Sequence, residues 1–271
     1  MVSHLKGVFM PRWDYKKDIA YDQIDRERIK ENSFLFKLLT IASFIEITSD
    51  VYDRNLSLYY QDNKEVVAWL NSVWEIEEIQ HGQALKEYIT RVWPEFDWQG
   101  AYEGFRKAYL PFCKVEALED SKAKEMLARM VVETGTSTAY KAIANYAKEL
   151  QEPVLEQLAK NISKDEIYHF EKFEETFKYY KKQEQLNSKD IMKLLYKRAK
   201  EINNEDIKIA YEALGAQESY EEYLKEVQKF AKKYYPYKMA IKMFIRPLEL
   251  SKFTENMVAS TIWPIFRVLG I

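Results

Sequence analysis

The sequence predicts an all-α protein, and three observations support that prediction. Apolar residues recur at three- and four-residue spacing through most of the chain, as they do on one face of a helix. Short runs of alternating polar and apolar residues, which are typical of strands, are missing. Glycine and proline, which often end helices, number only 7 each among 271 residues, so we expect few breaks and long helices.

Breaks divide the first part of the chain into four long helices and one short helix. The pair Asp62-Asn63 and the residue Pro94 end the first two, Pro111 ends the short helix, and Pro153 lies in the first turn of the last, where a helix tolerates proline. The expected helices cover about residues 29–61, 65–92, 98–110, 121–150 and 153–185. We expect them to form a core bundle over about residues 29–185.

The rest of the chain, about residues 186–271, contains shorter predicted helices. Their expected boundaries are Ser188 and Asn204 as N-caps, Gly215 as a C-cap, and Pro236, Pro247 and Pro264 as breaks. We expect this helical C-terminal extension to pack on the bundle, so that residues 1–271 form one domain.

Composition excludes several classes of protein. Lysine and arginine number 41 against 43 acidic residues, and this net charge of -2 argues against a general nucleic-acid binder, which needs a basic excess. The single cysteine, Cys113, excludes an internal disulfide, a four-cysteine zinc site and an iron–sulfur cluster held by the chain's own thiolates. It also favours a reducing compartment, so we predict a cytoplasmic protein. We expect neither a secretory signal nor a membrane span, because no uncharged apolar run reaches roughly 18 residues.

Two of the three histidines lie in the same local pattern, in which an acidic residue precedes Glu-x-x-His. The two copies are Glu77-Glu78-Ile79-Gln80-His81 and Asp165-Glu166-Ile167-Tyr168-His169. On a helix, positions i and i+3 share a face, so each copy can offer a carboxylate and an imidazole to one metal ion. One copy alone is typical of a solvated surface pair, but chance is a poor explanation for two.

A single glutamate precedes each copy at nearly the same distance. Glu46 lies 32 residues before Glu78, and Glu133 lies 33 residues before Glu166. Each half of the sequence therefore predicts a helix with one Glu, a turn, and an antiparallel helix with Glu-x-x-His at the matching depth. Ferritin-like di-iron carboxylate proteins have this ligand set.

The doubled pattern predicts two metal ions at the centre of a ferritin-like four-helix bundle. Four carboxylates and two imidazoles suit two iron ions, or one manganese and one iron, because hard oxygen ligands favour these metals over structural zinc. Four carboxylates buried without a metal would be very costly. The predicted ligands are Glu46, Glu78, His81, Glu133, Glu166 and His169.

Two acids are expected to support the histidines. A metal-bound histidine normally donates its second ring nitrogen to a carboxylate. The pseudo-twofold relation of the two halves pairs Asp165 with His81 and Glu77 with His169. The alternative is that both acids are simply exposed.

Two further side chains lie one turn from a predicted ligand. Trp74 lies one turn before Glu78. It either packs in the core or lines a route by which electrons reach the metals. Thr136, one turn after Glu133, is the candidate catalytic residue, because its hydroxyl would face the metals and steer protons. The alternative for Thr136 is a bond to a carbonyl of its own helix.

Four segments resemble the soluble acyl-carrier-protein desaturases. They are residues 74–85 (similar to W-x-x-E-E-N-R-H-G-D-L-L), residues 132–136 (E-R-A-T), residues 164–169 (D-E-K-R-H), and Glu46 with Tyr52 (E-E-A-x-P-T-Y). The resemblance covers about residues 35–185 and does not extend into the C-terminal extension.

The resemblance implies a reaction as well as roles. The implied roles are bridging iron ligands for Glu78 and Glu166, chelating ligands for Glu46 and Glu133, terminal ligands for His81 and His169, and oxygen activation for Thr136. That family inserts a double bond into a saturated acyl chain with dioxygen and two electrons from a ferredoxin. A fatty acyl substrate on acyl carrier protein, an external electron donor and a homodimer are therefore expected.

Other functions stay open. A different di-iron oxygenase (aldehyde-deformylating, hydroxylating or N-oxygenating) and a ferritin-type iron oxidation and storage protein share the ligand set. A metal-free bundle that contacts membranes or a partner is a third class. Residues 225–246, with seven basic residues and one Glu, could dock an acidic carrier protein or be a solvated helix face.

Overall fold

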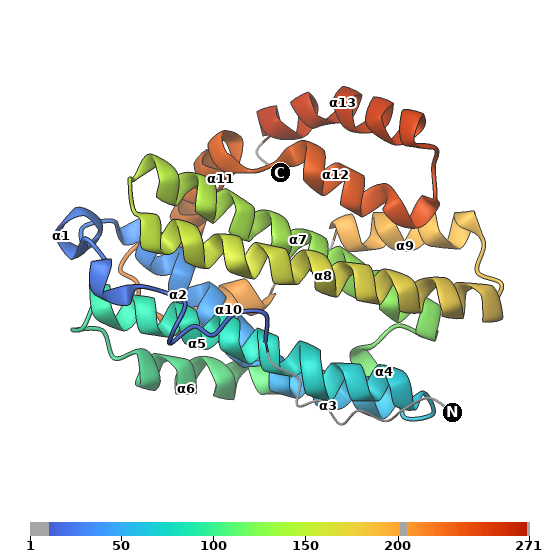
Figure 1. The fold of residues 1–271 in the computed structure, drawn as a ribbon, viewed down its shortest axis with the longest axis horizontal. Coiled ribbons are helices and arrows are strands. Elements are labelled where there is room, and N and C mark those ends of the chain that lie inside the picture. Colours follow the sequence, from blue (N-terminus) through green and yellow to red (C-terminus); the bar gives the residue numbers. More distant parts are fainter. Residues whose placement is uncertain (1–10, 201–204, 270–271) are drawn as a thin grey trace.

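Four helices form the centre of the protein in the computed structural model, which describes residues 11–200 and 205–269 (Figure 1). They are α2 (Ser33–Ile47), α5 (Glu75–Val92), α7 (Lys122–Glu149) and α8 (Pro153–Gln183). Helix α2 packs along α5, and α7 packs along α8. The described residues contain no strand, and the all-α prediction is confirmed.

The helix predicted over residues 29–61 is in fact divided. The short α1 (Arg26–Ile29) precedes α2, and α3 (Ser49–Tyr59) follows it after a break at Thr48, where ψ is 2°. The Thr48 hydroxyl donates to the carbonyl of Phe44 at 2.9 Å, a bond of the kind that bends helices. Apolar spacing continues through the break, so periodicity alone does not show it.

The helix predicted over residues 65–92 contains an irregular turn. Helix α4 (Lys64–Trp69) passes into α5 through a π-helical segment, Leu70–Trp74. A π segment inserts one residue into the regular helix and is frequent at functional sites. Here it lies directly before the helix that carries the first Glu-x-x-His.

The other predicted helices of the bundle are confirmed to within two residues. Helix α6 (Trp98–Tyr109) ends in a 3₁₀ turn that contains Pro111. Ser121 caps α7, its side chain accepting from the backbone N–H of Lys124, and Pro153 is the first residue of α8. The first-turn proline is what the sequence predicted, and the serine cap is a further feature of the structure.

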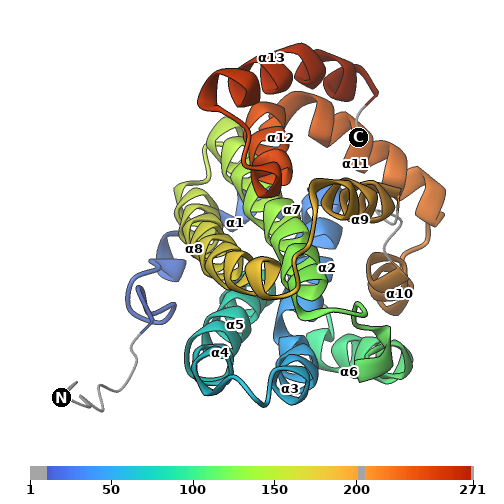
Figure 2. The same ribbon diagram turned by 90° about the vertical axis from the view of Figure 1, so that its right-hand side faces the viewer.

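Five further helices cover one side of the bundle (Figure 2). They are α9 (Ser188–Lys200), α10 (Glu205–Ala213), α11 (Tyr220–Tyr234), α12 (Tyr237–Ile245) and α13 (Lys252–Leu269). Helices α9, α11 and α12 contact α7, α10 contacts α2 and α6, and α13 contacts α12 and α11. The extension therefore packs on the bundle, with α13 as its outermost layer.

The predicted boundaries in the extension have mixed outcomes. Pro236 and Pro247 fall between helices, and Gly215 adopts a left-handed φ of 64° after α10, as a C-cap glycine does. Asn204 lies outside the described residues. No helix in the described ranges combines the length and apolar character needed to cross a bilayer.

Two boundary predictions were wrong. Asn187, not Ser188, caps α9: the Asn187 carboxamide accepts from the backbone N–H groups of Lys189 and Asp190 at 2.9 and 3.1 Å. Pro264 does not end a helix but lies inside α13. Proline removes one backbone hydrogen bond, and here the carbonyl it leaves unpaired belongs to an exposed turn, which water can solvate.

Candidate metal centre

The six predicted ligands come from the four central helices and meet inside the bundle. Glu46 comes from α2, Glu78 and His81 from α5, Glu133 from α7, and Glu166 and His169 from α8. None of the six is more than 6% exposed. Their ligand atoms form two groups of four within 4.8 Å of one another: Glu46, Glu78, His81 and Glu166, and Glu78, Glu133, Glu166 and His169. Two glutamates thus belong to both groups.

The distances show the same twofold relation. His81 Nδ1 lies 3.0 Å from Glu166 Oε1 and 4.0 Å from Glu46 Oε2. His169 Nδ1 lies 3.0 Å from Glu78 Oε1 and 4.0 Å from Glu133 Oε2. Each imidazole therefore faces a shared glutamate from the other hairpin and, slightly farther away, the single glutamate of its own hairpin.

Both imidazoles are held from behind by an acid. His81 Nε2 lies 3.1 Å from Asp165 Oδ2, and His169 Nε2 lies 2.9 Å from Glu77 Oε2. These are the two pairs that the sequence predicted. Since a carboxylate accepts the Nε2 proton, the Nδ1 atoms carry the lone pairs that point into the cluster.

Three buried atoms in the cluster lack a hydrogen-bond partner among the described residues. They are Nδ1 of His81, Nδ1 of His169 and Oε1 of Glu166. Buried polar atoms are nearly always paired, and unpaired ones that converge on one point fit a metal site. The residues present therefore fit a pair of divalent cations.

The electrostatics of the cluster favour the same interpretation. Burial, and then the carboxylates of Glu78 and Glu166, raise the pKa of Glu46 well above its ordinary value, and burial with the same neighbours raises the pKa of Glu133. Burial also opposes ionisation of Glu166, but His169 and His81 beside it hold its pKa well below the usual range. The cluster has more carboxylates than its own imidazoles neutralise, and two cations would supply the missing charge.

The glycine after His81 is required by close helix packing. A Cβ atom on Gly82 would lie 2.8 Å from the backbone nitrogen of Ile47 and 2.9 Å from the carbonyl oxygen of Ser43, both on α2. Real Cβ atoms do not approach backbone this closely, so glycine lets α5 press against α2. This contact fixes the distance between Glu46 and the ligands of α5.

Thr136 reaches the cluster, as the sequence predicted. Its hydroxyl lies 3.2 Å from Glu166 Oε2 and 3.4 Å from Glu133 Oε2. It also lies 3.3 Å from the carbonyl of Glu133, so the local helix bond is present too. Trp74, which is buried, donates its indole N–H to Glu133 Oε1 at 3.3 Å. Both side chains therefore touch one of the predicted ligands.

Sequence reasoning missed three residues of this site. The phenol of Tyr140 donates to Glu46 Oε1. From the N-terminal segment, Arg12 Nη1 and Trp13 Nε1 donate to Asp165 at 2.7 and 2.6 Å. Tyr140 lies two turns after Glu133 on the same face, and that spacing could have revealed it. Arg12 and Trp13 lie in a segment without periodicity, more than 150 residues from their partner, and no local signal identifies them.

A groove lies beside the cluster, where the C-terminal helices meet the α7–α8 pair. Its volume is about 460 Å³, and its lining is Ile167, Phe170, Lys238, Met239, Lys242, Met243, Arg246 and Glu255. Ile167 and Phe170 directly follow the ligands Glu166 and His169 in the chain. Met243 also contacts Ser137, the neighbour of Thr136, with 3.7 Å between hydroxyl and sulfur. The lining of the groove therefore includes the chain neighbours of two predicted ligands.

Comparison with known proteins agrees with this geometry. A model of the fatty acid desaturase family matches residues 57–198, just over half of the chain. The match includes both Glu-x-x-His copies and Glu133, whereas Glu46 lies before it. Comparison with curated proteins and with solved structures finds no match. The buried carboxylate and histidine cluster, the helical fold and the matching family model together show that this chain belongs to the fatty acid desaturase family.

Proposed function

We propose that this protein is a di-iron, dioxygen-dependent oxidoreductase that introduces a double bond into a fatty acyl chain, within a ferritin-like bundle. Membership of the fatty acid desaturase family supports the reaction type. The observation that carries the metal assignment is the pair of overlapping four-ligand groups that share Glu78 and Glu166. Glu78 and Glu166 would therefore be available to both ions of a dinuclear site.

The proposed iron ligands are the six residues of the cluster. When bound there, a pair of iron ions supplies redox chemistry for reducing dioxygen and oxidising a C–H bond. Asp165 and Glu77 hold the Nε2 protons of His81 and His169, so that each Nδ1 lone pair points at the metal position. A pair of iron ions fits this set best, and one manganese with one iron is the alternative.

Thr136 is the proposed proton-handling residue. Its hydroxyl is within hydrogen-bond distance of carboxylate oxygens of both Glu133 and Glu166, and the side chain is only partly buried. One hydroxyl proton can serve only one acceptor at a time. The Thr136 hydroxyl would therefore relay a proton by accepting one from solvent as it donates its own to a carboxylate of the cluster.

The groove between α8 and the C-terminal helices is the proposed place for the acyl chain. Half of its lining, Ile167, Phe170, Met239 and Met243, is apolar, and methionine adapts readily to a flexible chain. Its volume of about 460 Å³ falls in the usual range for small-molecule sites. Acyl carrier protein, an external donor such as ferredoxin, a homodimer and a cytoplasmic location stay predictions.

Iron stoichiometry followed by product analysis tests this function. The protein is loaded anaerobically with ferrous iron, freed of loosely bound metal, reduced, and exposed to dioxygen with a saturated acyl substrate. We expect about two irons per chain and a product that has lost two hydrogen atoms. Glu171→Ala, an exposed change on α8, serves as the matched control for His169→Ala.

Each other outcome excludes this function. An iron ratio near zero that His169→Ala does not change would exclude the metal site. A ratio far above two would indicate storage. A product that has gained an oxygen atom, or lost a carbon atom, would indicate a hydroxylating or deformylating enzyme instead.

A further inference from the structure

Helix α13 exposes large apolar side chains to solvent. It is the outermost layer of the C-terminal helices (Figure 1) and packs on α12 and α11 through inward residues such as the fully buried Ala259. On its outer side, Phe253 is 79% exposed, Met257 52%, Ile265 58% and Val268 74%. Exposed apolar side chains gathered on one helix mark an interaction surface.

These side chains form a continuous stripe. Phe253, Met257, Pro264 and Val268 are spaced by 4, 7 and 4 residues, so they fall on one face of the helix, with Ile265 at its edge. Between Glu255 and Arg267 the helix carries no charged residue. The polar residues within this stretch are small or neutral. The outer face is therefore apolar along almost the whole helix.

Cations and a tryptophan border this stripe. The Trp263 ring lies between Lys238, whose Nζ is 5.3 Å from the ring centroid, and Arg267, whose Cζ is 5.8 Å from it. Arg267 Nε also donates to the carbonyl of Lys232 at 3.0 Å. Lys238 of α12 and the backbone of α11 thus meet α13 at Trp263 and Arg267. Tryptophan beside Lys and Arg is the combination that lies at the headgroup level of a bilayer.

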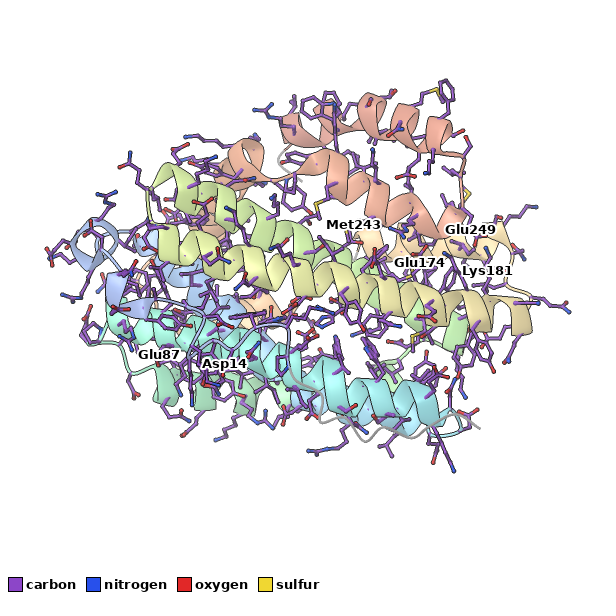
Figure 3. All side chains as sticks on the ribbon, in the orientation of Figure 1. Asp14, Glu87, Glu174, Lys181, Met243 and Glu249 are labelled. Carbon is purple, nitrogen blue, oxygen red and sulfur yellow. The ribbon has the colours of Figure 1, made fainter. Side chains whose placement is uncertain are left out.

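The acids of this layer do not neutralise that edge. Glu249 pairs with Lys181 of α8 (Figure 3), and Glu255 lines the groove on the inner side of α13. Among the described residues, Lys238 and Lys242 have no carboxylate within ion-pair distance. The outer face is therefore apolar at its centre and positive at its border.

We propose that the outer face of α13 binds the surface of an anionic lipid bilayer, with its apolar stripe in the interface and its border cations among the headgroups. An amphipathic helix with such a stripe lies in the plane of a membrane surface. Charge complementarity favours this partner over a second copy of the chain, since a second copy would bring further cations to the same interface. An acidic carrier protein would satisfy the cations but leave the apolar stripe unexplained.

The surface also adjoins the groove beside the cluster. Lys238 borders Trp263 and also lines the groove, and Glu255 of α13 forms part of its wall. A docked bilayer would therefore lie next to the groove and could supply acyl chains to it. This last consequence rests on the proposed function, but lipid binding itself does not.

Vesicle flotation tests the proposal. The full-length protein is mixed with vesicles of phosphatidylcholine alone or phosphatidylcholine with phosphatidylglycerol. We expect flotation only with the anionic vesicles, and loss of about tenfold or more in partitioning for the triple variant Phe253→Ser, Met257→Ser and Val268→Ser. The matched control is Met192→Ser with Tyr196→Ser, which changes two side chains of α9 that are 59% and 63% exposed.

A charge variant separates the electrostatic part. Lys238→Glu with Arg267→Glu should abolish flotation, whereas Lys193→Glu on α9 should not. Unchanged flotation of the triple variant overturns the proposal, as does equal binding to neutral vesicles. Two results together would assign the face to self-association instead. They are that the unmodified protein binds no vesicles, and that the triple variant is a monomer where the unmodified protein is a dimer. Because vesicle binding needs no iron, these results are independent of iron content and turnover.

Discussion

The two helical hairpins that carry the cluster supply equivalent proposed ligands from unequal structures. Helices α7 and α8 run unbroken for 28 and 31 residues. The first hairpin is interrupted on both sides, at Thr48 after α2 and at the π segment Leu70–Trp74 before α5. Nevertheless, each hairpin places one Glu and one Glu-x-x-His at the same depth. The ligand positions depend on the short stretches around them and tolerate irregularity one or two turns away.

The residues that follow the two histidines show how the surroundings differ. His81 is followed by Gly82, which is pressed against the backbone of α2. His169 is followed by Phe170, a buried ring that lines the groove, with Arg246 Cζ 5.6 Å from its centroid. C-terminal helices contact both hairpins, but the groove is lined by α8 of the second hairpin and by no residue of the first. Substrate access is therefore expected on the side of the second hairpin.

The largest expected effect comes from removing a ligand that both metal positions share. Glu166→Ala should reduce bound iron from about two per chain to near zero, because Glu166 belongs to both four-ligand groups. Glu46→Ala, which belongs to one group, should leave roughly one iron. Metal analysis after gel filtration measures both, with Glu171→Ala as the control. Equal losses in both variants would show that the two positions fill only together.

A buried acid of the first hairpin should make stability depend on pH. Asp53 is 3% exposed, and burial, followed by the nearby Glu75, raises its pKa to about 7. The unfolded chain ionises this group near pH 4, so stability falls as the pH rises from about 4 to about 7 and then stays level. Asp53→Asn should remove this fall and be more stable at pH 8 by about 4 kcal/mol, which corresponds to a pKa difference of about three units.

Urea unfolding at several pH values measures that difference. Glu174 of the second hairpin is the useful contrast, since it is also buried but pairs with Lys178 at 2.8 Å and Arg246 at 2.9 Å. Glu174→Gln should destabilise the protein, the opposite of the effect at Asp53. If Asp53→Asn leaves the pH profile unchanged, Asp53 is ionised in the folded protein.

The acids behind the histidines should affect metal affinity by a smaller amount. Asp165→Ala removes the partner of His81 and should weaken iron binding by about 10- to 100-fold, the usual effect of losing such a support. Trp13→Phe removes only one donor to Asp165 and should have a weaker effect in the same direction. Competition with a ferrous chelator measures both. An affinity equal to that of Glu171→Ala would show that Asp165 does not orient His81.

The smallest expected effect concerns packing in the first hairpin. Gly82→Ala should destabilise the protein by about 1–3 kcal/mol, because the added Cβ would overlap backbone atoms of α2. The matched change Gly104→Ala, on α6, meets no atom within 4 Å and should be neutral or stabilising, since alanine favours helices. Thermal or urea unfolding compares the two variants. Equal stabilities would show that α5 can move away from α2 at little cost.

Much of the fold and of the candidate site could be predicted from local sequence. Helices α7 and α8 follow from apolar spacing and, for α8, a first-turn proline, both of which act within one or two turns. The positions of the six ligands and of Asp165 and Glu77 follow from one repeated motif, because the 3.6-residue period of a helix fixes which side chains share a face. The break at Thr48 and the π segment are exceptions, because neither disturbs the apolar pattern.

The sequence by itself therefore determined the helical class and the chemistry of the cluster. Tertiary structure decided what surrounds that cluster. Arg12 and Trp13 reach Asp165 only because the N-terminal segment folds back on α8. Packing against α12 and α11 decides which side of α13 is covered and which side stays exposed. Local periodicity specifies a face of one helix, but which segment covers that face depends on packing between residues far apart in the chain.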